Sequence, residues 1–165
     1  LLRQFLEAGI RPGPALKTLN AAMKLRCQTS GGFSTVDLAV MQRQSGCVEL
    51  YKCGAAPSYL KRGGSVRRLY SDAPPAGLSD SPLPPDQVKI PVQAGDFLVL
   101  ISDGIADRSC DEWLLNLLAG WNGSSADELT ALILSESRCR KGLADDCAVA
   151  VLHLPTAAEN QKTAV

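Results

Sequence analysis

The sequence has few of the residues that mark several common classes of protein. Aromatic residues make up 5% of its 165 residues, and His153 is the single histidine. So few aromatic rings provide no stacking platform for single-stranded nucleic acid. His153 lies in an alternating strand-like segment, which favours a structural role over a triad base or a metal ligand. No glycine-rich phosphate loop of the Walker or Rossmann form is present.

Net charge, long apolar runs and paired cysteines are also absent. Lysine plus arginine and aspartate plus glutamate are equal, at 17 each, so no binding to nucleic acid is expected. No apolar run approaches the ~18 residues that span a bilayer, so no membrane contact is expected for this segment. The six cysteines form no CxxC pair, which favours reduced thiols over a disulfide framework or a zinc site, and hence a cytoplasmic location.

The pattern of apolar residues and breakers predicts an α+β fold. The expected helices cover residues 1–9, 12–26, 111–119 and 125–139, and the expected strands cover residues 33–42, 48–53, 58–62, 65–70, 88–93, 97–102 and 147–154. Strands cluster in the middle without a repeating strand–helix order, which favours mainly antiparallel sheets with segregated helices. Asp111 and Ser125 are expected to cap the last two helices. The proline-rich segment 71–86 is expected to be a loop, and residues 155–165 a disordered tail.

Asp103 is the first candidate for chemistry, because an apolar strand ends directly before Asp103–Gly104. A carboxylate at a strand end can point into a cleft, and magnesium and manganese prefer oxygen ligands. Viewed alone, an Asp–Gly pair is more typical of a simple turn.

Two further segments carry charges that point to a site. Asp145 and Asp146 repel each other unless a cation or hydrogen-bond donors compensate them, so one of them could meet Asp103 at a shared metal. A solvated loop explains this pair equally well. Lys61 and Arg62, in a predicted hairpin, could contact the negative charge of a phosphoprotein, although a solvated hairpin is the simpler interpretation.

Taken in order, four segments resemble the SpoIIE-type branch of the metal-dependent serine/threonine phosphatases (PPM). They are residues 33–38, 54–63, 95–105 and 145–146. The resemblance implies an αββα sandwich of mainly antiparallel sheets flanked by helices, with residues 1–154 as the phosphatase domain. It implies a cleft with two manganese or magnesium ions, for which Asp103 and Asp145 match metal ligands while Gly104 and Asp146 support them.

The same resemblance implies a substrate and a setting for the reaction. A metal-activated water would hydrolyse phosphoserine or phosphothreonine on a regulatory protein, by analogy an anti-anti-sigma factor in sporulation control. The parent protein would carry membrane segments that are absent here. The first residues already read as helix and no methionine opens the chain, so we expect a domain truncated at its N-terminus.

Two departures from the family pattern leave other functions open. Further metal ligands are expected upstream of the first helix, and Cys147–Ala148 stands where the family has an apolar residue followed by threonine. A phosphatase-like interaction module without catalysis is therefore the alternative, and an unrelated antiparallel α/β domain is a third interpretation. Missing upstream strands would uncover sheet edges, so association into a homodimer or with a longer protein is also expected.

Overall fold

The structure is a computed structural model, and it describes residues 1–154 except 31, 43–45, 79–85, 108 and 142–144. These residues form two compact units. The first contains Leu1–Ala55 and Ser71–Pro91, and the second contains Ala56–Tyr70 and the chain from Val92 onward. Among the described residues, no helix combines the length and apolar character needed to cross a membrane.

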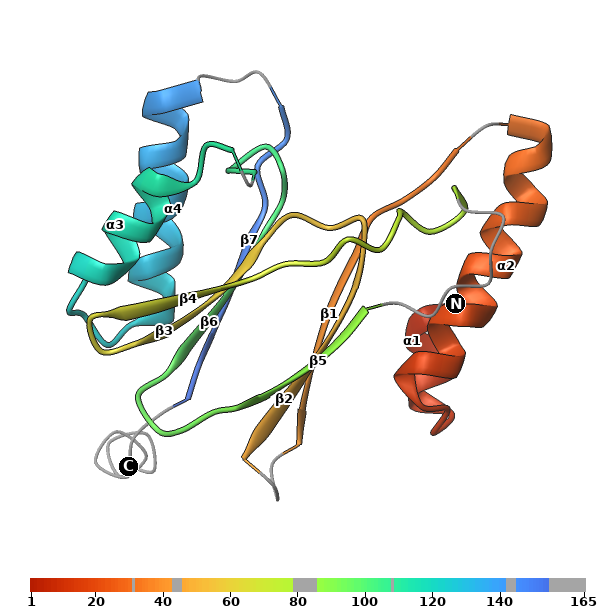
Figure 1. The fold of residues 1–165 in the computed structure, drawn as a ribbon, viewed down its shortest axis with the longest axis horizontal. Helices are drawn as coiled ribbons and strands as arrows, with labels where there is room; N and C mark the ends of the chain where they lie inside the picture. The colour runs from red at the N-terminus through yellow and green to blue at the C-terminus, as the bar shows by residue number, and fades with distance from the viewer. Residues whose placement is uncertain (31, 43–45, 79–85, 108, 142–144, 155–165) are drawn as a thin grey trace. The chain divides into compact units, whose positions relative to one another are not determined.

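The first unit combines two helices with a three-stranded antiparallel sheet (Figure 1). The helices are α1 (Leu2–Glu7) and α2 (Pro12–Ser30), and the strands are β1 (Val36–Gln42), β2 (Cys47–Cys53) and β5 (Asp86–Pro91). The strand order is β1-β2-β5. The strands predicted over residues 33–42 and 48–53 are confirmed and pair with each other as an antiparallel hairpin, while α2 extends four residues beyond its expected end.

Alternation along β2 separates two faces of this sheet. Val48 and Leu50 are fully buried, and so is Lys52, which lies on the same face. The Lys52 ammonium donates a 2.6 Å hydrogen bond to Asp37 directly across the strand pair. Burial lowers the pKa of Lys52, and the ion pair with Asp37 opposes this shift. A charged pair therefore replaces apolar packing at one position of the sheet.

The second unit contains a four-stranded antiparallel sheet in the order β4-β3-β6-β7 (Figure 1). Its strands are β3 (Ser58–Arg62), β4 (Ser65–Leu69), β6 (Phe97–Ile101) and β7 (Val149–His153). The predicted hairpin of β3 and β4 is confirmed. Its turn contains Gly63 with φ +54°, a backbone conformation that glycine adopts without strain.

Helices α3 (Glu112–Gly120) and α4 (Ala126–Lys141) pack on this second sheet (Figure 1). Their buried side chains meet those of β3 and β6 in one core. Its fully buried members include Tyr59, Val99, Leu114, Leu118, Leu129 and Ile133. The predicted α+β class, with antiparallel sheets and separate helices, is therefore confirmed.

The structure bears out one predicted helix cap and contradicts the other. The backbone N–H of Glu128 donates a 3.2 Å hydrogen bond to the Ser125 hydroxyl at the start of α4, as predicted. Asp111 precedes α3, but its side chain makes no capping hydrogen bond. It accepts hydrogen bonds from the Tyr59 hydroxyl at 2.7 Å and from Arg68 at 2.6 Å, because both donors approach it from the sheet.

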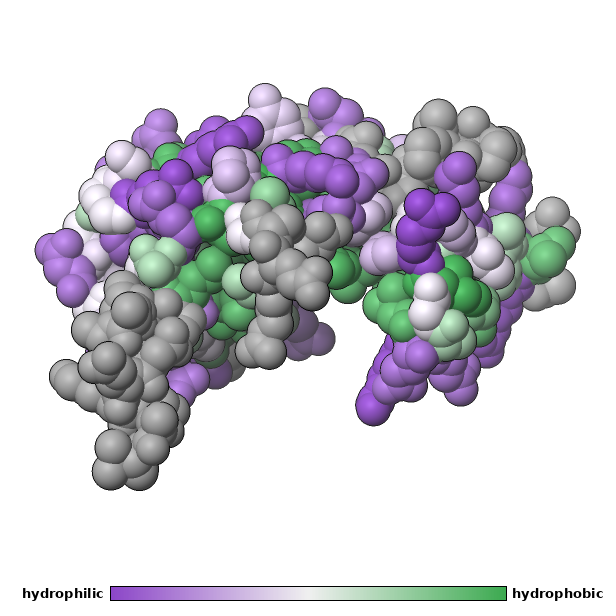
Figure 2. Space-filling view, turned by 90° about the horizontal axis from the view of Figure 1, so that it is seen from below, coloured by the Kyte–Doolittle hydropathy of each residue, from purple (hydrophilic) through white to green (hydrophobic). Residues whose placement is uncertain are grey.

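Apolar side chains remain exposed near the first helix. Helix α1 contains no buried residue, and Leu1 and Ile10 beside it are 55% and 41% exposed. Figure 2 shows apolar residues at the surface in this part of the first unit. These residues keep apolar surface in contact with water at this end of the first unit.

Candidate active site

Asp103 lies just beyond the end of β6, at one edge of the second sheet. The strand before it is strongly apolar, with Leu98 and Val99 fully buried, whereas the Asp103 side chain is exposed. The backbone N–H of Gly104 donates a 3.2 Å hydrogen bond to Asp103 Oδ1. The burial of the strand thus fixes where the backbone emerges, and the carboxylate follows immediately at the surface.

Asp145 and Asp146 precede β7, the neighbour of β6. The two strands are antiparallel and Ile101 pairs with Val149, so the residues after β6 lie beside the residues before β7. Both aspartates are exposed, and the N–H of Asp146 donates a 2.8 Å hydrogen bond to Asp145 Oδ1. The sheet register therefore brings Asp103 and Asp145 to the same edge.

Hydrogen bonds from Ser102 join the two aspartate segments. Its N–H donates to the carbonyl oxygen of Ala148 at 2.9 Å, and its hydroxyl accepts the N–H of Ala148, also at 2.9 Å. The same hydroxyl donates to the carbonyl oxygen of Asp146 at 3.1 Å. Ser102 thereby extends the β6–β7 pairing toward the aspartates.

Gly104 and Cys147 also connect the loop after β6 to the segment before β7, and we call this set of contacts the junction. A Cβ atom on Gly104 would overlap the carbonyl oxygen of Asp146 and would lie 3.5 Å from the Cβ atom of Asp145. The Cys147 thiol donates to the carbonyl oxygen of Gly104 at 3.4 Å. Cys147 stands at the departure from the family pattern, and here its thiol contacts the aspartate loop directly.

The carboxylates at this edge of the sheet supply some of the oxygen ligands that a hard divalent cation needs. Asp103 and Asp145 each supply carboxylate oxygens, and magnesium or manganese can be held by one or two carboxylates while keeping several waters. Within the described stretches of the chain, no group of three or more histidine, cysteine or acidic side chains is arranged to hold a metal. The residues present therefore fit part of the coordination of one ion, and a site with two ions needs further ligands.

Lys61 and Arg62 are not brought to these aspartates. Lys61 lies opposite Phe97, the first residue of β6, whereas Asp103 follows the last residue of that strand. The Lys61 ammonium donates to the carbonyl oxygen of Gly63, and Arg62 forms an ion pair with Asp96 at 2.7 Å. Lys61 therefore bonds within the turn of the β3–β4 hairpin, whereas Arg62 connects this hairpin to the residue before β6. Their contact with a substrate stays a prediction.

Comparison with known proteins adds sequence and structural relatives. A model of the family described as "Stage II sporulation protein E (SpoIIE)" matches residues 1–155. Stage II sporulation protein E of Bacillus subtilis strain 168 is 31% identical over 161 residues, which cover 93% of this chain and 19% of that protein. The chain thus spans about a fifth of the length of this relative.

Two solved structures from Bacillus subtilis extend the similarity to the fold. One contains the PP2C phosphatase domain and a fragment of the regulatory domain of SpoIIE, with a TM-score of 0.81, 28% identity, and coverage of 93% of this chain and 48% of that chain. The other is the SpoIIE phosphatase domain presoaked with manganese, with a TM-score of 0.68, 29% identity, and coverage of 93% and 71%.

Proposed function

Because the chain belongs to the stage II sporulation protein E family, we propose that it is part of a phosphatase domain that hydrolyses phosphoserine and phosphothreonine with manganese or magnesium. The observation that carries this proposal is the pairing of β6 with β7, which puts Asp103 after the end of β6 and Asp145 before the start of β7, with Gly104 packed against the Asp145–Asp146 segment. Each carboxylate accepts a backbone hydrogen bond, from Gly104 or from Asp146, and a bound cation would compensate the negative charge that remains at this edge.

Each residue of the junction has a distinct role in this proposal. Asp103 and Asp145 would hold the ion, and the nearby charge of Asp146 would strengthen the attraction for a cation. When bound, the ion supplies Lewis acidity toward a phosphoryl oxygen and lowers the pKa of a water. Ser102 and Gly104 keep the two carboxylate segments at a fixed separation, through the hydrogen bonds and the close backbone contact described above.

The proposed substrate is a phosphorylated regulatory protein, by family analogy an anti-anti-sigma factor in sporulation control. The names of the related proteins support a role in sporulation. A cytoplasmic location is supported by cysteines that form no disulfide in the described part of the chain, among them Cys47, Cys110, Cys139 and Cys147. Residues 1–154 would form the phosphatase-like portion.

Metal binding by the 165-residue chain tests the proposal. Isothermal titration with Mn²⁺ should show binding that Asp103→Asn and Asp145→Asn each abolish. Asp127→Asn is the matched control, because Asp127 is equally exposed but lies in the first turn of α4. A wild-type titration without binding, or binding that survives both site variants, would contradict the assignment. Hydrolysis of a phosphoserine peptide in saturating Mn²⁺ then measures turnover.

A second candidate function is a phosphatase-like interaction module without turnover. The observation that favours it is the small donor set, since Asp103 and Asp145 are only part of what two ions require. The two candidates differ in the peptide assay. Hydrolysis that depends on Asp103 favours the enzyme, whereas Mn²⁺ binding without hydrolysis favours the module.

We also propose that the chain associates with a second copy of itself. The exposed apolar residues Leu1 and Ile10 beside α1 support this, because burying them in a contact would remove apolar surface from water. A second copy could also contribute ligands to the incomplete donor set.

A further inference from the structure

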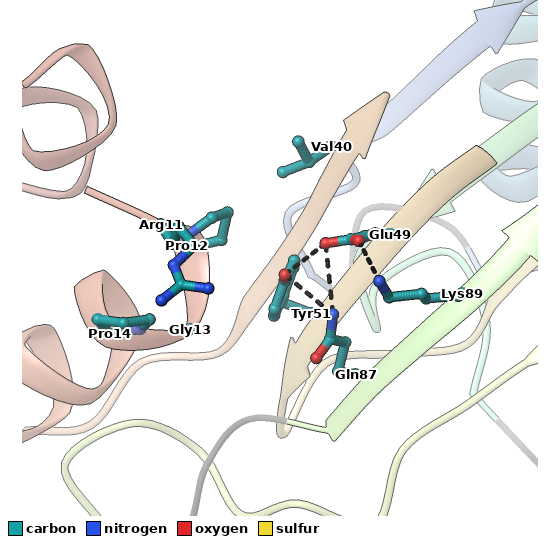
Figure 3. Close-up of a pocket in the computed structure, with 9 residues that line it drawn as sticks. All are labelled: Arg11, Pro12, Gly13, Pro14, Val40, Glu49, Tyr51, Gln87 and Lys89. Carbon is teal, nitrogen blue, oxygen red and sulfur yellow. Dashed lines mark hydrogen bonds and ion pairs between the residues drawn. The ribbon is translucent and has the colours of Figure 1, made fainter. Parts of the chain in front are cut away.

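The first unit contains a cavity with both polar and apolar lining, which the proposed phosphatase chemistry does not use (Figure 3). Its volume is about 640 Å³, which lies within the range of about 300–1,000 Å³ typical of small-molecule sites. Residues 11–14 line one side, and Val40, Glu49, Tyr51, Gln87 and Lys89 from the sheet line the other. All of these residues belong to one compact unit, whereas Asp103 and Asp145 belong to the other.

Glu49 is the centre of a hydrogen-bonded network on the sheet side of the cavity. Its carboxylate accepts hydrogen bonds from the Tyr51 hydroxyl at 2.6 Å and from the Gln87 amide at 3.3 Å, and it pairs with the Lys89 ammonium at 2.8 Å. Lys89 lowers the pKa of Glu49 most strongly, followed by Tyr51. The negative charge of Glu49 is therefore compensated within the sheet, and it does not require a cationic ligand.

Arg11 supplies a second positive charge on the opposite side. Its side chain is exposed, and within the described residues it makes no hydrogen bond or ion pair. Figure 3 shows it directly before Pro12, facing the strand that carries Tyr51. Lys89 and Glu49 balance each other as an ion pair, so the guanidinium of Arg11 leaves the lining of the cavity with a net positive charge.

The geometry points to a binding site for a small organic oxyanion, a carboxylate or a phosphate ester. The planar guanidinium of Arg11 presents paired N–H groups that match the oxygens of either anion. Lys89 retains N–H groups beyond its pairing with Glu49. Pro12, Pro14 and Val40 provide apolar surface for the body of the ligand. This site is independent of the proposed hydrolysis.

Titrations followed by ¹H–¹⁵N NMR of the whole chain test this site with matched probes. Benzoate and benzamide have nearly the same shape and differ in charge, and phenyl phosphate replaces the carboxylate by a phosphate. We expect saturable shifts at the amides of Gly13, Val40 and Lys89 with benzoate, phenyl phosphate or both, and none with benzamide. Equal shifts with benzamide, or no saturable shift with either anion, would overturn the proposal.

Three variants assign the binding to the cations of the cavity. Arg11→Gln should weaken anion binding on the order of tenfold or more, because a charge-assisted hydrogen-bonded pair is lost. Arg67→Gln, at an exposed arginine on β4, is the control and should leave the affinity unchanged. Lys89→Gln should also weaken anion binding. It provides an independent test if the amide spectrum of the free Arg11→Gln variant shows that this substitution disturbs the fold. The proposed site would be contradicted if Arg67→Gln lost as much anion affinity as the cavity variants. It would also be contradicted if Arg11→Gln and Lys89→Gln both kept the wild-type affinity.

Discussion

Gly104 lies against the backbone of Asp146 so closely that a side chain at position 104 would overlap the Asp146 carbonyl oxygen. The contact joins residues that are 42 positions apart in the sequence, the loop after β6 and the segment before β7. Because neither backbone can move toward the other, the positions of Asp103 and Asp145 are coupled through this contact. Only glycine fits at position 104 without a backbone shift, because every other residue has a Cβ atom.

The first prediction concerns this contact. Gly104→Ala should lower the free energy of unfolding by about 1–3 kcal/mol, because the backbone must shift to admit the methyl group. Urea denaturation measures the change. Gly64→Ala is the control, since a Cβ atom there would meet its nearest neighbour, the Ala119 carbonyl oxygen, at an ordinary 4.0 Å. Equal losses of stability in the two variants would show that the Asp146 contact is not the cause.

The second prediction concerns the Ser102 hydroxyl, which bonds to both Ala148 and Asp146. Ser102→Ala should reduce the free energy of unfolding by about 0.5–1.5 kcal/mol, the usual net value of a hydrogen bond. If the proposed metal site is correct, it should also weaken Mn²⁺ binding, because the carboxylate segments lose one connection. Ser102→Thr keeps the hydroxyl and should retain both properties. An Ala variant with unchanged stability would contradict this role.

Local pattern was sufficient for some parts of this fold and insufficient for others. The Ser125 cap and the hairpin that contains Lys61 and Arg62 were predicted correctly, because both depend on residues close in sequence. Asp111 looked like a cap for the same local reason. Its partners Tyr59 and Arg68 are 52 and 43 residues away, and no local pattern reports contacts over such separations.

The site shows the same division. The residues alone suggested that Asp145 or Asp146 could share a metal with Asp103, and the family resemblance selected Asp145. Their shared edge depends on the register of β6 with β7, which pairs Ile101 with Val149. The role of Ser102 was missed, because its hydroxyl acts on Ala148, which is distant in the sequence.

The third prediction concerns the buried pair of Tyr59 and Asp111. Their 2.7 Å hydrogen bond connects the centre of the second sheet to the start of α3. A double-mutant cycle with Tyr59→Phe and Asp111→Ala, followed by urea denaturation, should give a coupling energy of about 1 kcal/mol or more. Additive losses would mean that the two side chains contribute independently and that the hydrogen bond adds no stability.

The fourth prediction concerns the pH dependence of stability through Glu49. The hydrogen bonds from Lys89 and Tyr51 lower the pKa of Glu49 below its usual value of 4.5. The folded chain therefore binds this proton less readily than the unfolded chain, so the contribution is fully present above pH 4.5 and is lost as the pH falls through the folded value. Thermal unfolding should show a smaller loss of Tm for Glu49→Gln than for the wild type between pH 5 and pH 3. Parallel curves would contradict the shift.

The fifth prediction concerns association through the apolar surface near α1. Ile10 is 41% exposed and belongs to the first unit, whereas Leu132 on α4 has a similar exposure of 37% and belongs to the second. If two copies meet through the α1 surface, Ile10→Glu should convert a dimer into a monomer in sedimentation velocity, because a charge would be buried without a partner. Leu132→Glu should leave the dimer intact. A wild-type chain that sediments as a monomer at all concentrations would disprove self-association, and a dimer disrupted only by Leu132→Glu would place the contact on the second unit instead.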